Sequence, residues 1–247
     1  MKRLKRKDIF WLIIIGLCLF IAYDAHFNYV DWRTADRSST HMAPEPQIDE
    51  AIVQVYTART YNWRGYFAVH PWVAVKKKNE HFYTVYQVTG WDLLMNKKSV
   101  SIKKDIPDRM WYGRKPHILQ TLRGETAENA IPKIEKAVES YPYADEYRLW
   151  PGPNSNTFVA HIIRNVPELT VELPSTAIGK DFLGYKVFHA KSPSGSGYQV
   201  SILGTVSLIV GLREGFELGV LGLSFGVDFY PPALKLPIIG RLGFKDI

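Results

Sequence analysis

The chain has 247 residues, of which 46% are hydrophobic and 22% charged, and these ordinary fractions exclude global disorder and suit one substantial domain or two small ones. The formal net charge of +7 at pH 7 is concentrated, because five of the 31 basic residues lie within residues 1–7, which leaves 26 basic against 24 acidic residues in the remainder. The other basic runs are short and typical of solvated turns, so we expect no nucleic acid among the partners.

The basic N-terminus is followed by an uninterrupted apolar run over residues 9–22. This run is shorter than the about 20 residues typical of a membrane span, and its length also suits a signal peptide. No small residue stands two positions before Ala22 or Ala25, however, so the usual cleavage signal is missing. We therefore predict an uncleaved signal anchor over residues 1–24, with a cleaved signal as the alternative. The positive-inside rule keeps the N-terminus in the cytoplasm and exports the rest of the chain.

Residues 25–47 mix charged residues, Ser, Thr and Pro without periodicity, which predicts a linker ahead of one exported domain over residues 48–247. Aromatic and β-branched residues predict strands in that domain. The predicted strands cover residues 51–56, 65–75, 82–88, 118–122 and 167–173. Pro71 within the second of them indicates a sheet edge or a bulge.

Two helices are predicted from apolar spacing. Residues 124–141 place Ala127, Ile131, Ile134 and Val138 on one face, and Pro132 should bend this helix or mark its start. Residues 156–165 show the same helical spacing. The predicted fold class is therefore α+β, with a mostly antiparallel sheet, the 156–165 helix packed on it and a second helix at about residues 125–140.

The C-terminal part contains two long apolar runs, over residues 199–212 and 216–229. In the second run, bulky residues alternate with Gly, Ser and Asp, which predicts a strand with one bulky face and one nearly bare face. Another strand pair or a membrane can approach the bare face closely. The apolar end of the chain, residues 231–244, is expected to be a dry core element, with lipid contact as the alternative.

The stretch over residues 150–158 combines a rigid loop with a helix start. Two prolines and a glycine break regular structure, and Asn154, Ser155 and Asn156 are all good N-cap residues. A helix N-terminus presents free N–H groups and the positive end of the helix dipole, which suit an anion or a nucleophile. Simple capping of the helix is the alternative explanation.

His70 is the candidate general base for the Ser155 hydroxyl, because it lies in a predicted strand where an imidazole is not needed for packing. A hairpin turning at residues 77–79 brings the following strand back beside it. Gln87, His81 and Tyr83 are the polar choices there for orienting the imidazole, and the sequence does not separate them. The single cysteine, Cys18, and the scattered histidines predict no metal site, and no cofactor is expected.

Two motifs resemble the permuted papain-like NlpC superfamily, which includes lecithin–retinol acyltransferase-like enzymes. These motifs are His70-Pro71-Trp72-Val73-Ala74-Val75 and Asn154-Ser155-Asn156-Thr157-Phe158-Val159. The resemblance implies a papain-like fold with a nucleophile at Ser155 and a base at His70. The sequence differs from the superfamily at the nucleophile, because the superfamily has cysteine where this chain has Ser155. A serine hydroxyl does not ionise as a thiol does, so it needs a base and an oxyanion hole.

The chain resembles more closely a bacterial family known as domain of unknown function 3750, over about residues 50–245. The segments that carry this likeness are 88–91, 141–143, 150–158, 177–181, 214–217 and 234–237. The likeness brings no activity with it and implies a bacterial protein. Together with the predicted anchor, we expect a single-pass bacterial inner-membrane protein with a periplasmic domain.

Two functions follow as expectations. One is an envelope hydrolase or acyltransferase acting on an amide, ester or thioester, with Asn154 and Asn156, or nearby N–H groups, supporting the oxyanion. The other is a non-catalytic binding or scaffold protein that uses the 150–158 loop, including Trp150, and Trp72 as a ligand surface.

Overall fold

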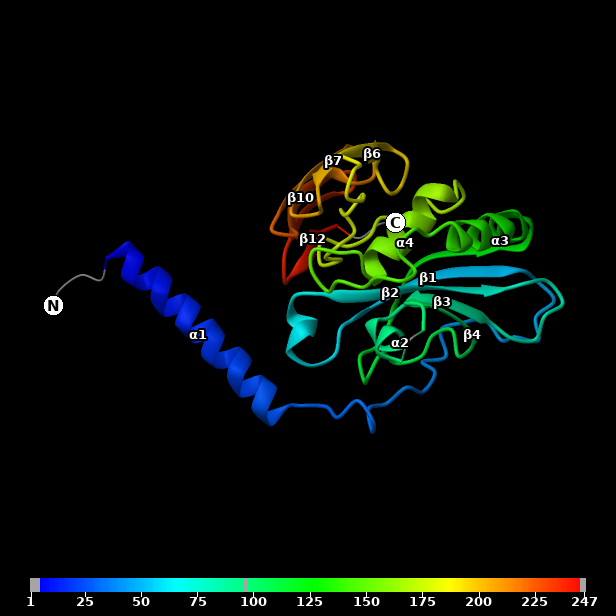
Figure 1. Ribbon diagram of the computed structural model, residues 1–247, viewed down its shortest axis with the longest axis horizontal. Coiled ribbons are helices and arrows are strands. Elements are labelled where there is room, and N and C mark those ends of the chain that lie inside the picture. Colours follow the sequence, from blue (N-terminus) through cyan, green and yellow to red (C-terminus); the bar gives the residue numbers. More distant parts are fainter. Residues whose placement is uncertain (1–4, 96, 245–247) are drawn as a thin grey trace.

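The computed structural model describes residues 5–95 and 97–244. They form a mixed α and β structure with two antiparallel sheets, from which the N-terminal helix α1 (Arg6–Phe27) projects (Figure 1). Within the described residues, α1 is the one helix long and apolar enough to cross a membrane, and its apolar window is not buried. With 22 residues, α1 has the length that a bilayer requires.

The first sheet, sheet 1, has the strand order β4-β3-β2-β1-β5. Its strands are β1 (Ile52–Arg59), β2 (Val69–Lys76), β3 (Thr84–Val88), β4 (Val100–Lys104) and β5 (His117–Arg123), with the short helices η1 (Asn62–Tyr66) before β2 and α2 (Gly90–Leu94) after β3. The strands predicted at 51–56, 82–88 and 118–122 are confirmed, whereas β4 was not predicted. The strand predicted from residue 65 begins later, at Val69. Gly65 instead packs a tight turn against Thr60, where a Cβ would lie 2.2 Å from the carbonyl oxygen.

The expectation that Pro71 marks a sheet edge is wrong for the strand as a whole, because β2 is the central strand of sheet 1. The proline is tolerated for a local reason. β3 pairs with β2 only from Val73 to Val75, and the backbone of Val69 bonds outside the sheet instead, to the Thr176 carbonyl at 3.2 Å. In a strand, the backbone nitrogens of residues two apart, such as Val69 and Pro71, point towards the same edge. β3 does not pair with β2 at this position, so the N–H that proline lacks leaves no hydrogen bond between strands unformed.

Helices α3 (Gly124–Glu139) and α4 (Ser155–Asn165) cover one face of sheet 1 and confirm both predicted helices. Every second side chain of β1 and β2, such as Val55 and Val73, packs under them, and the alternate ones, such as Tyr56 and Trp72, form a second cluster on the opposite face. Pro132 lies inside α3, so it does not mark the helix start.

The segment predicted as a linker is packed on the second face of sheet 1. The buried Asp108 carboxylate accepts hydrogen bonds from the Ser39 hydroxyl at 2.7 Å and from the backbone N–H groups of Met42 and Ala43 at 2.5 and 3.1 Å. Further towards the N-terminus, the Val30 N–H donates to the Asn62 side chain at 2.8 Å. These bonds fix the segment across the sheet, because a buried carboxylate needs such donors.

The second sheet, sheet 2, is an antiparallel meander with the order β12-β11-β10-β9-β8-β7-β6. Its strands are β6 (His189–Lys191), β7 (Gly197–Ile202), β8 (Val206–Gly211), β9 (Gly215–Val220), β10 (Leu223–Phe229), β11 (Pro232–Leu236) and β12 (Gly240–Gly243). Figure 1 shows this sheet on the far side of α4 from sheet 1. The strand predicted over 167–173 is absent, and that segment runs as irregular chain between the two layers.

The alternation predicted in the second C-terminal run is confirmed on β10, although that run forms two strands, β9 and β10, and not one. The dry-core expectation for the end of the chain is wrong. On β10 the bulky residues Phe225 and Phe229 point outward, while Ser224 and Asp228 are buried. On β11 Leu234 is likewise exposed. The bare face turns inward because the 179–182 loop packs against it. A Cβ on Gly219 would lie 3.1 Å from the Asp181 carboxylate.

Candidate functional site

The first turn of α4 is held by Asn154, the residue before it. The Asn154 side-chain oxygen accepts from the backbone N–H groups of Asn156 and Thr157 at 2.9 and 3.2 Å, and the Thr157 hydroxyl accepts from the Asn154 N–H in return. The Asn154 amide nitrogen donates to the carbonyl oxygens of Leu149 and Ile178 at 3.1 and 3.0 Å. The predicted cap is therefore present, and it ties the helix start to two loops.

Ser155 is the first residue of α4, and its side chain is buried. Among the described residues, neither its hydroxyl nor its backbone N–H forms a hydrogen bond. By contrast, the Asn156 amide makes two, to the carbonyl oxygens of Val69 at 3.2 Å and Ile178 at 2.8 Å. The capping bonds therefore leave Ser155 as the unused hydroxyl at the positive end of the helix.

His70 has a fixed orientation on β2. Its Nε2 lies 3.1 Å from the side-chain oxygen of Gln87 on β3, and its ring stacks on Trp111 with centroids 3.7 Å apart. An amide oxygen only accepts, so Nε2 carries the proton and Nδ1 keeps a free lone pair. Of the three polar neighbours considered from the sequence, Gln87 contacts the imidazole. Tyr83 donates to the Pro44 carbonyl at 2.9 Å, and His81 lines a separate cavity.

Burial of the His70 ring lowers its pKa from 6.5 to about 4, although the bond to Gln87 partly opposes this shift. The folded chain thus holds this imidazole neutral where the unfolded chain would protonate it. Stability contributed by this group is present above the unfolded pKa and is lost as the pH falls towards the folded pKa. Between about pH 7.5 and about pH 5, His70 alone should remove about 2 kcal/mol from the free energy of unfolding.

The His70→Gln variant tests this pH dependence. Urea unfolding at the two pH values should show a loss for the wild type that exceeds the loss for the variant by about 2 kcal/mol. The comparison isolates His70, because burial also lowers the pKa of His161 and that contribution is common to both proteins. Equal losses in wild type and variant would contradict a buried neutral imidazole.

The start of α4 meets β2 at the residue next to His70. Asn156 bonds the Val69 carbonyl, and the Val69 side chain packs with Phe158 on the helix-covered face. The His70 ring lies among Trp72 and Trp111, on the opposite face. Ser155 and His70 thus come to the same end of β2, with their side chains on different elements and no hydrogen bond between them among the described residues.

Both tryptophans expected at a ligand surface have structural contacts. Trp72 is buried, donates from its indole nitrogen to the Pro107 carbonyl at 2.7 Å, and stacks on Tyr56. Trp150 is half exposed and donates to the Leu221 carbonyl at 2.8 Å, in the turn before β10. Trp72 therefore belongs to the core, and Trp150 links the α4 loop to sheet 2.

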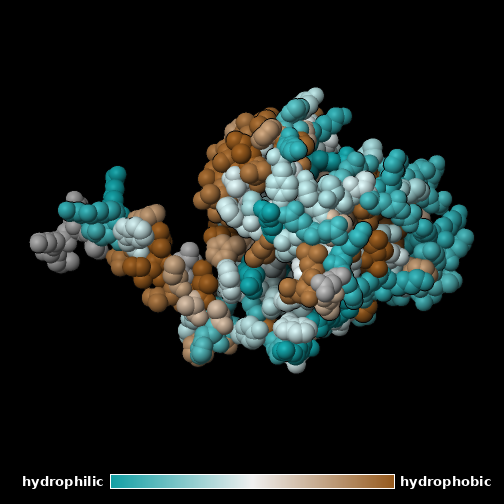
Figure 2. Space-filling model, in the orientation of Figure 1, coloured by the Kyte–Doolittle hydropathy of each residue, from teal (hydrophilic) through white to brown (hydrophobic). Residues whose placement is uncertain are grey.

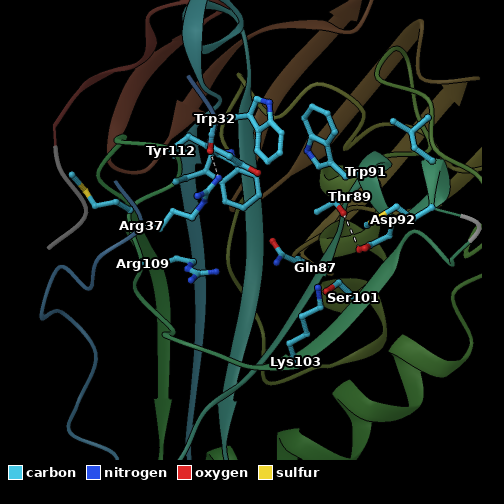
Figure 3. A pocket seen from close by; sticks show the side chains of 14 residues that line it. Trp32, Arg37, Gln87, Thr89, Trp91, Asp92, Ser101, Lys103, Arg109 and Tyr112 are labelled. Atoms are coloured by element: carbon cyan, nitrogen blue, oxygen red, sulfur yellow. Dashed lines mark hydrogen bonds between the residues drawn. The ribbon is translucent and has the colours of Figure 1, made fainter. Parts of the chain in front are cut away.

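Two cavities flank the His70–Gln87 pair. The smaller, of about 290 Å³, is lined by His70 and by Leu149, whose carbonyl holds the Asn154 cap. The larger, of about 450 Å³, is lined by Gln87 and by side chains that sequence reasoning missed. These include Trp32, Arg37, Trp91, Lys103, Arg109 and Trp111. Figure 3 shows Gln87 between the rings of Trp32 and Trp91 and the Lys103 side chain.

No local signal could have found this larger cavity, because the packed segment before β1 supplies one of its walls. Trp32 and Arg37 belong to the stretch predicted as a linker, and Arg37 lies over the Tyr112 ring at 4.5 Å. Within residues 5–95 and 97–244, no group of three or more His, Cys, Asp or Glu residues is arranged to hold a metal ion.

Residues 50–182 match the model of a protein family of unknown function, DUF3750. The chain belongs to the DUF3750 family. The match covers sheet 1, both of its helices and the 150–158 stretch, and it ends before sheet 2. The segments 214–217 and 234–237, expected to share the likeness, lie outside it. No curated protein and no solved structure matches the chain. The DUF3750 region therefore contains Ser155, His70 and Gln87 together.

Proposed function

We propose that this DUF3750 protein is a membrane-anchored hydrolase or acyltransferase of the bacterial cell envelope, with Ser155 as nucleophile, His70 as general base and Gln87 as the residue that orients the imidazole. The observation that carries the proposal is the His70–Gln87 hydrogen bond, which leaves Nδ1 unprotonated on a residue that lines the same cavity as Leu149 of the Asn154 loop. A sheet with a nucleophile-bearing helix on it and a paired base on its strands is the papain-like arrangement of parts that we assign to the family.

The reaction follows from these groups. The Ser155 oxygen attacks the carbonyl carbon of an amide or ester while His70 Nδ1 takes the hydroxyl proton. His70 then gives that proton to the leaving amine or alcohol, and a covalent acyl-serine remains. Water or an acceptor alcohol or amine, deprotonated by His70, then attacks the acyl carbonyl carbon, and His70 returns this proton to the departing Ser155 oxygen as the acyl–serine bond breaks. The two side chains, both in the described part of the chain, form no hydrogen bond with each other in this structure, so the reaction requires a rearrangement that brings Ser155 Oγ within about 3 Å of His70 Nδ1.

In this mechanism a backbone N–H group stabilises the developing oxyanion, and the two asparagine side chains do not. Both amide nitrogens, of Asn154 and Asn156, already donate to backbone carbonyl oxygens. The Ser155 N–H is the donor that the cap leaves unused, and it lies at the positive end of the α4 dipole. This refines the sequence expectation, which gave the oxyanion to Asn154 and Asn156 or to nearby N–H groups.

The envelope location rests on α1 and the basic residues before the apolar run. Lys2, Arg3, Lys5, Arg6 and Lys7 precede that run, and the positive-inside rule keeps them in the cytoplasm. The domain that follows α1 then lies in the periplasm and works on substrates of the envelope.

A fluorophosphonate serine-hydrolase probe tests the catalytic assignment. The full-length wild type should be labelled, and Ser155→Ala should abolish labelling. His70→Gln should lower the labelling rate by at least 100-fold, because general-base catalysis contributes about 10²–10⁴. Ser140→Ala, which removes a hydroxyl bonded to the Ala137 carbonyl at the end of α3, serves as the matched control. Labelling that survives Ser155→Ala refutes Ser155 as nucleophile.

A binding function is the second candidate, and the larger cavity favours it. Aromatic rings line that cavity with three cations, Arg37, Lys103 and Arg109, and one carboxylate, Asp92. Arg109 is paired with Asp105, and the excess of positive charge suits an anionic ligand with an apolar body. A folded wild type that the probe does not label at all would favour this function over catalysis.

A further inference from the structure

The two faces of sheet 2 have the opposite character to those of a sheet in water: its outward side chains are apolar and its buried side chains are largely polar. On its five longer strands the outward side chains are apolar almost throughout, whereas a sheet facing water alternates apolar-in and polar-out. The exposed outward residues are Tyr198, Val200, Ile202, Val206, Leu208, Val210, Phe216, Leu218, Val220, Phe225, Val227, Phe229 and Leu234. The outer face of sheet 2, defined by these residues, is far larger than the scattered apolar side chains of an ordinary surface.

The inner face of sheet 2 carries the polar groups instead. Gln199 and Ser207 are buried there, and Glu217 forms ion pairs with Lys180 and Lys235, all of them nearly without solvent contact. The sheet thus places charges inside and hydrocarbon outside. This is the alternation of strands that face lipid on one side, as in membrane β structures.

The exposed charges around the outer face have one sign. In residues 183–244 the acidic side chains are Glu214, Glu217 and Asp228, and all three are buried. The exposed charged residues of the same segment are Lys186, Lys191 and Arg213. Basic residues beside an apolar face complement a surface of anionic lipid headgroups.

The position of the outer face agrees with the membrane segment of the same chain. Figure 2 shows the hydrophobic patch over sheet 2 on the side of the domain that faces α1. From α1 to β1 the chain is bound to the domain, through Val30 and through the Ser39 contact with Asp108, so the domain cannot move far from the end of α1. A bilayer that holds α1 is therefore within reach of the outer face.

We propose that the outer face of sheet 2 docks on the lipid bilayer and inserts its apolar side chains among the acyl chains, with Lys186, Lys191 and Arg213 against anionic headgroups. The strands, at most seven residues long, are shorter than the about 9–11 residues of a membrane-spanning strand, so the sheet lies in the interface. A second copy fits this face less well, because pairing two identical faces would bring like charges together. This inference is independent of the role of Ser155.

Lipid-borne quenching tests the docking on the full-length chain. In a Cys18→Ser background, single cysteines at Leu208, Leu218 or Val227 carry an environment-sensitive fluorophore, and Lys136→Cys and Glu128→Cys on α3 serve as controls. The protein is reconstituted in vesicles of equal parts phosphatidylcholine and phosphatidylglycerol. Labels on sheet 2 should be quenched several-fold more by doxyl lipids than by iodide, and labels on α3 should show the reverse. Because α1 anchors every variant equally, the readout reports the sheet alone.

Two results would overturn the proposal. Iodide quenching of the sheet 2 labels as strong as that on α3 would show that the face stays in water. Protection from both quenchers, together with energy transfer between labels on two copies, would show that a second chain covers it. A charge reversal, Lys191→Glu with Arg213→Glu, should reduce doxyl quenching at Leu218→Cys, and an unchanged value would remove the headgroup contacts from the proposal.

Discussion

Replacing Glu217 with alanine is expected to lower the free energy of unfolding by about 3–5 kcal/mol, because the change leaves the buried Lys180 ammonium group without its ion-pair partner and takes from Lys235 one of three carboxylates. Glu217 lies on the inner face of β9, where one carboxylate oxygen pairs with Lys180 and the other lies 2.9 Å from Lys235. Both lysine side chains are about 2% exposed, so water cannot replace the carboxylate.

The pKa of Glu217 has the direction that this geometry requires. Burial alone would raise it, but the ammonium groups of Lys180 and Lys235 outweigh burial and hold the pKa of the carboxyl below its usual value. The group therefore stays ionised at neutral pH and contributes stability that is lost as the pH falls through its folded pKa. Glu217→Ala removes that contribution at every pH above it.

Urea unfolding at neutral pH measures the effect, with Glu128→Ala as the matched control. Glu128 pairs with Lys78 at 3.8 Å on the surface, where removing the carboxylate should change the free energy of unfolding by less than about 1 kcal/mol. A Glu217→Ala loss no larger than the control would show that the network is open to water. In that case the inverted polarity of sheet 2 would also need another explanation.

Sequence reasoning located the elements whose neighbours along the chain decide their structure. Helix α4 begins at Ser155, one residue before the predicted range of 156–165 and directly after one of the three candidate cap residues, and α3 buries Ile131 and Ile134 on the predicted face. In both cases local spacing and capping determine the helix, and the sheet only selects which face is buried.

The sequence did not show where tertiary contacts overrule local composition. Residues 25–47 have no periodicity, yet part of the segment packs because the buried Asp108 carboxylate, far along the chain, takes its N–H groups. The alternation of β10 predicted two unlike faces but not which one turns inward. That choice depends on Lys180 and Asp181, which place charges against the bare face.

The sequence predicted the proposed catalytic residues of the candidate site, but it did not predict the residues that line the cavities around them. His70 and Gln87 follow from a short hairpin, in which a polar residue on β3 returns beside β2. Trp111, which stacks on the imidazole, comes from an irregular segment between β4 and β5 that carries no pairing pattern. Cavities formed by such segments arise only when distant loops meet.

Replacing Asn154 with alanine should cost about 3–5 kcal/mol of unfolding free energy, more than the about 1 kcal/mol of an ordinary N-cap. The cap bonds account for part of this loss, and the carbonyl oxygens of Leu149 and Ile178 would lose their donor as well. Asn154→Asp separates the two contributions, because aspartate keeps the acceptor for the helix N–H groups but presents a negative oxygen to both carbonyls.

We therefore expect Asn154→Asp to be no more stable than Asn154→Ala, and both variants to lose labelling of Ser155 by the fluorophosphonate probe. Asn165→Ala is the control on the same helix, since it removes only an exposed bond to the His161 carbonyl at 2.8 Å. If Asn154→Asp had the free energy of unfolding of the wild type, the capping bonds alone would account for the structure of the first turn of α4. Because the Asn154 amide nitrogen joins the 149 and 178 loops to the start of α4, losing it should instead displace Ser155 from the end of β2, and the loss of labelling should then accompany the loss of stability.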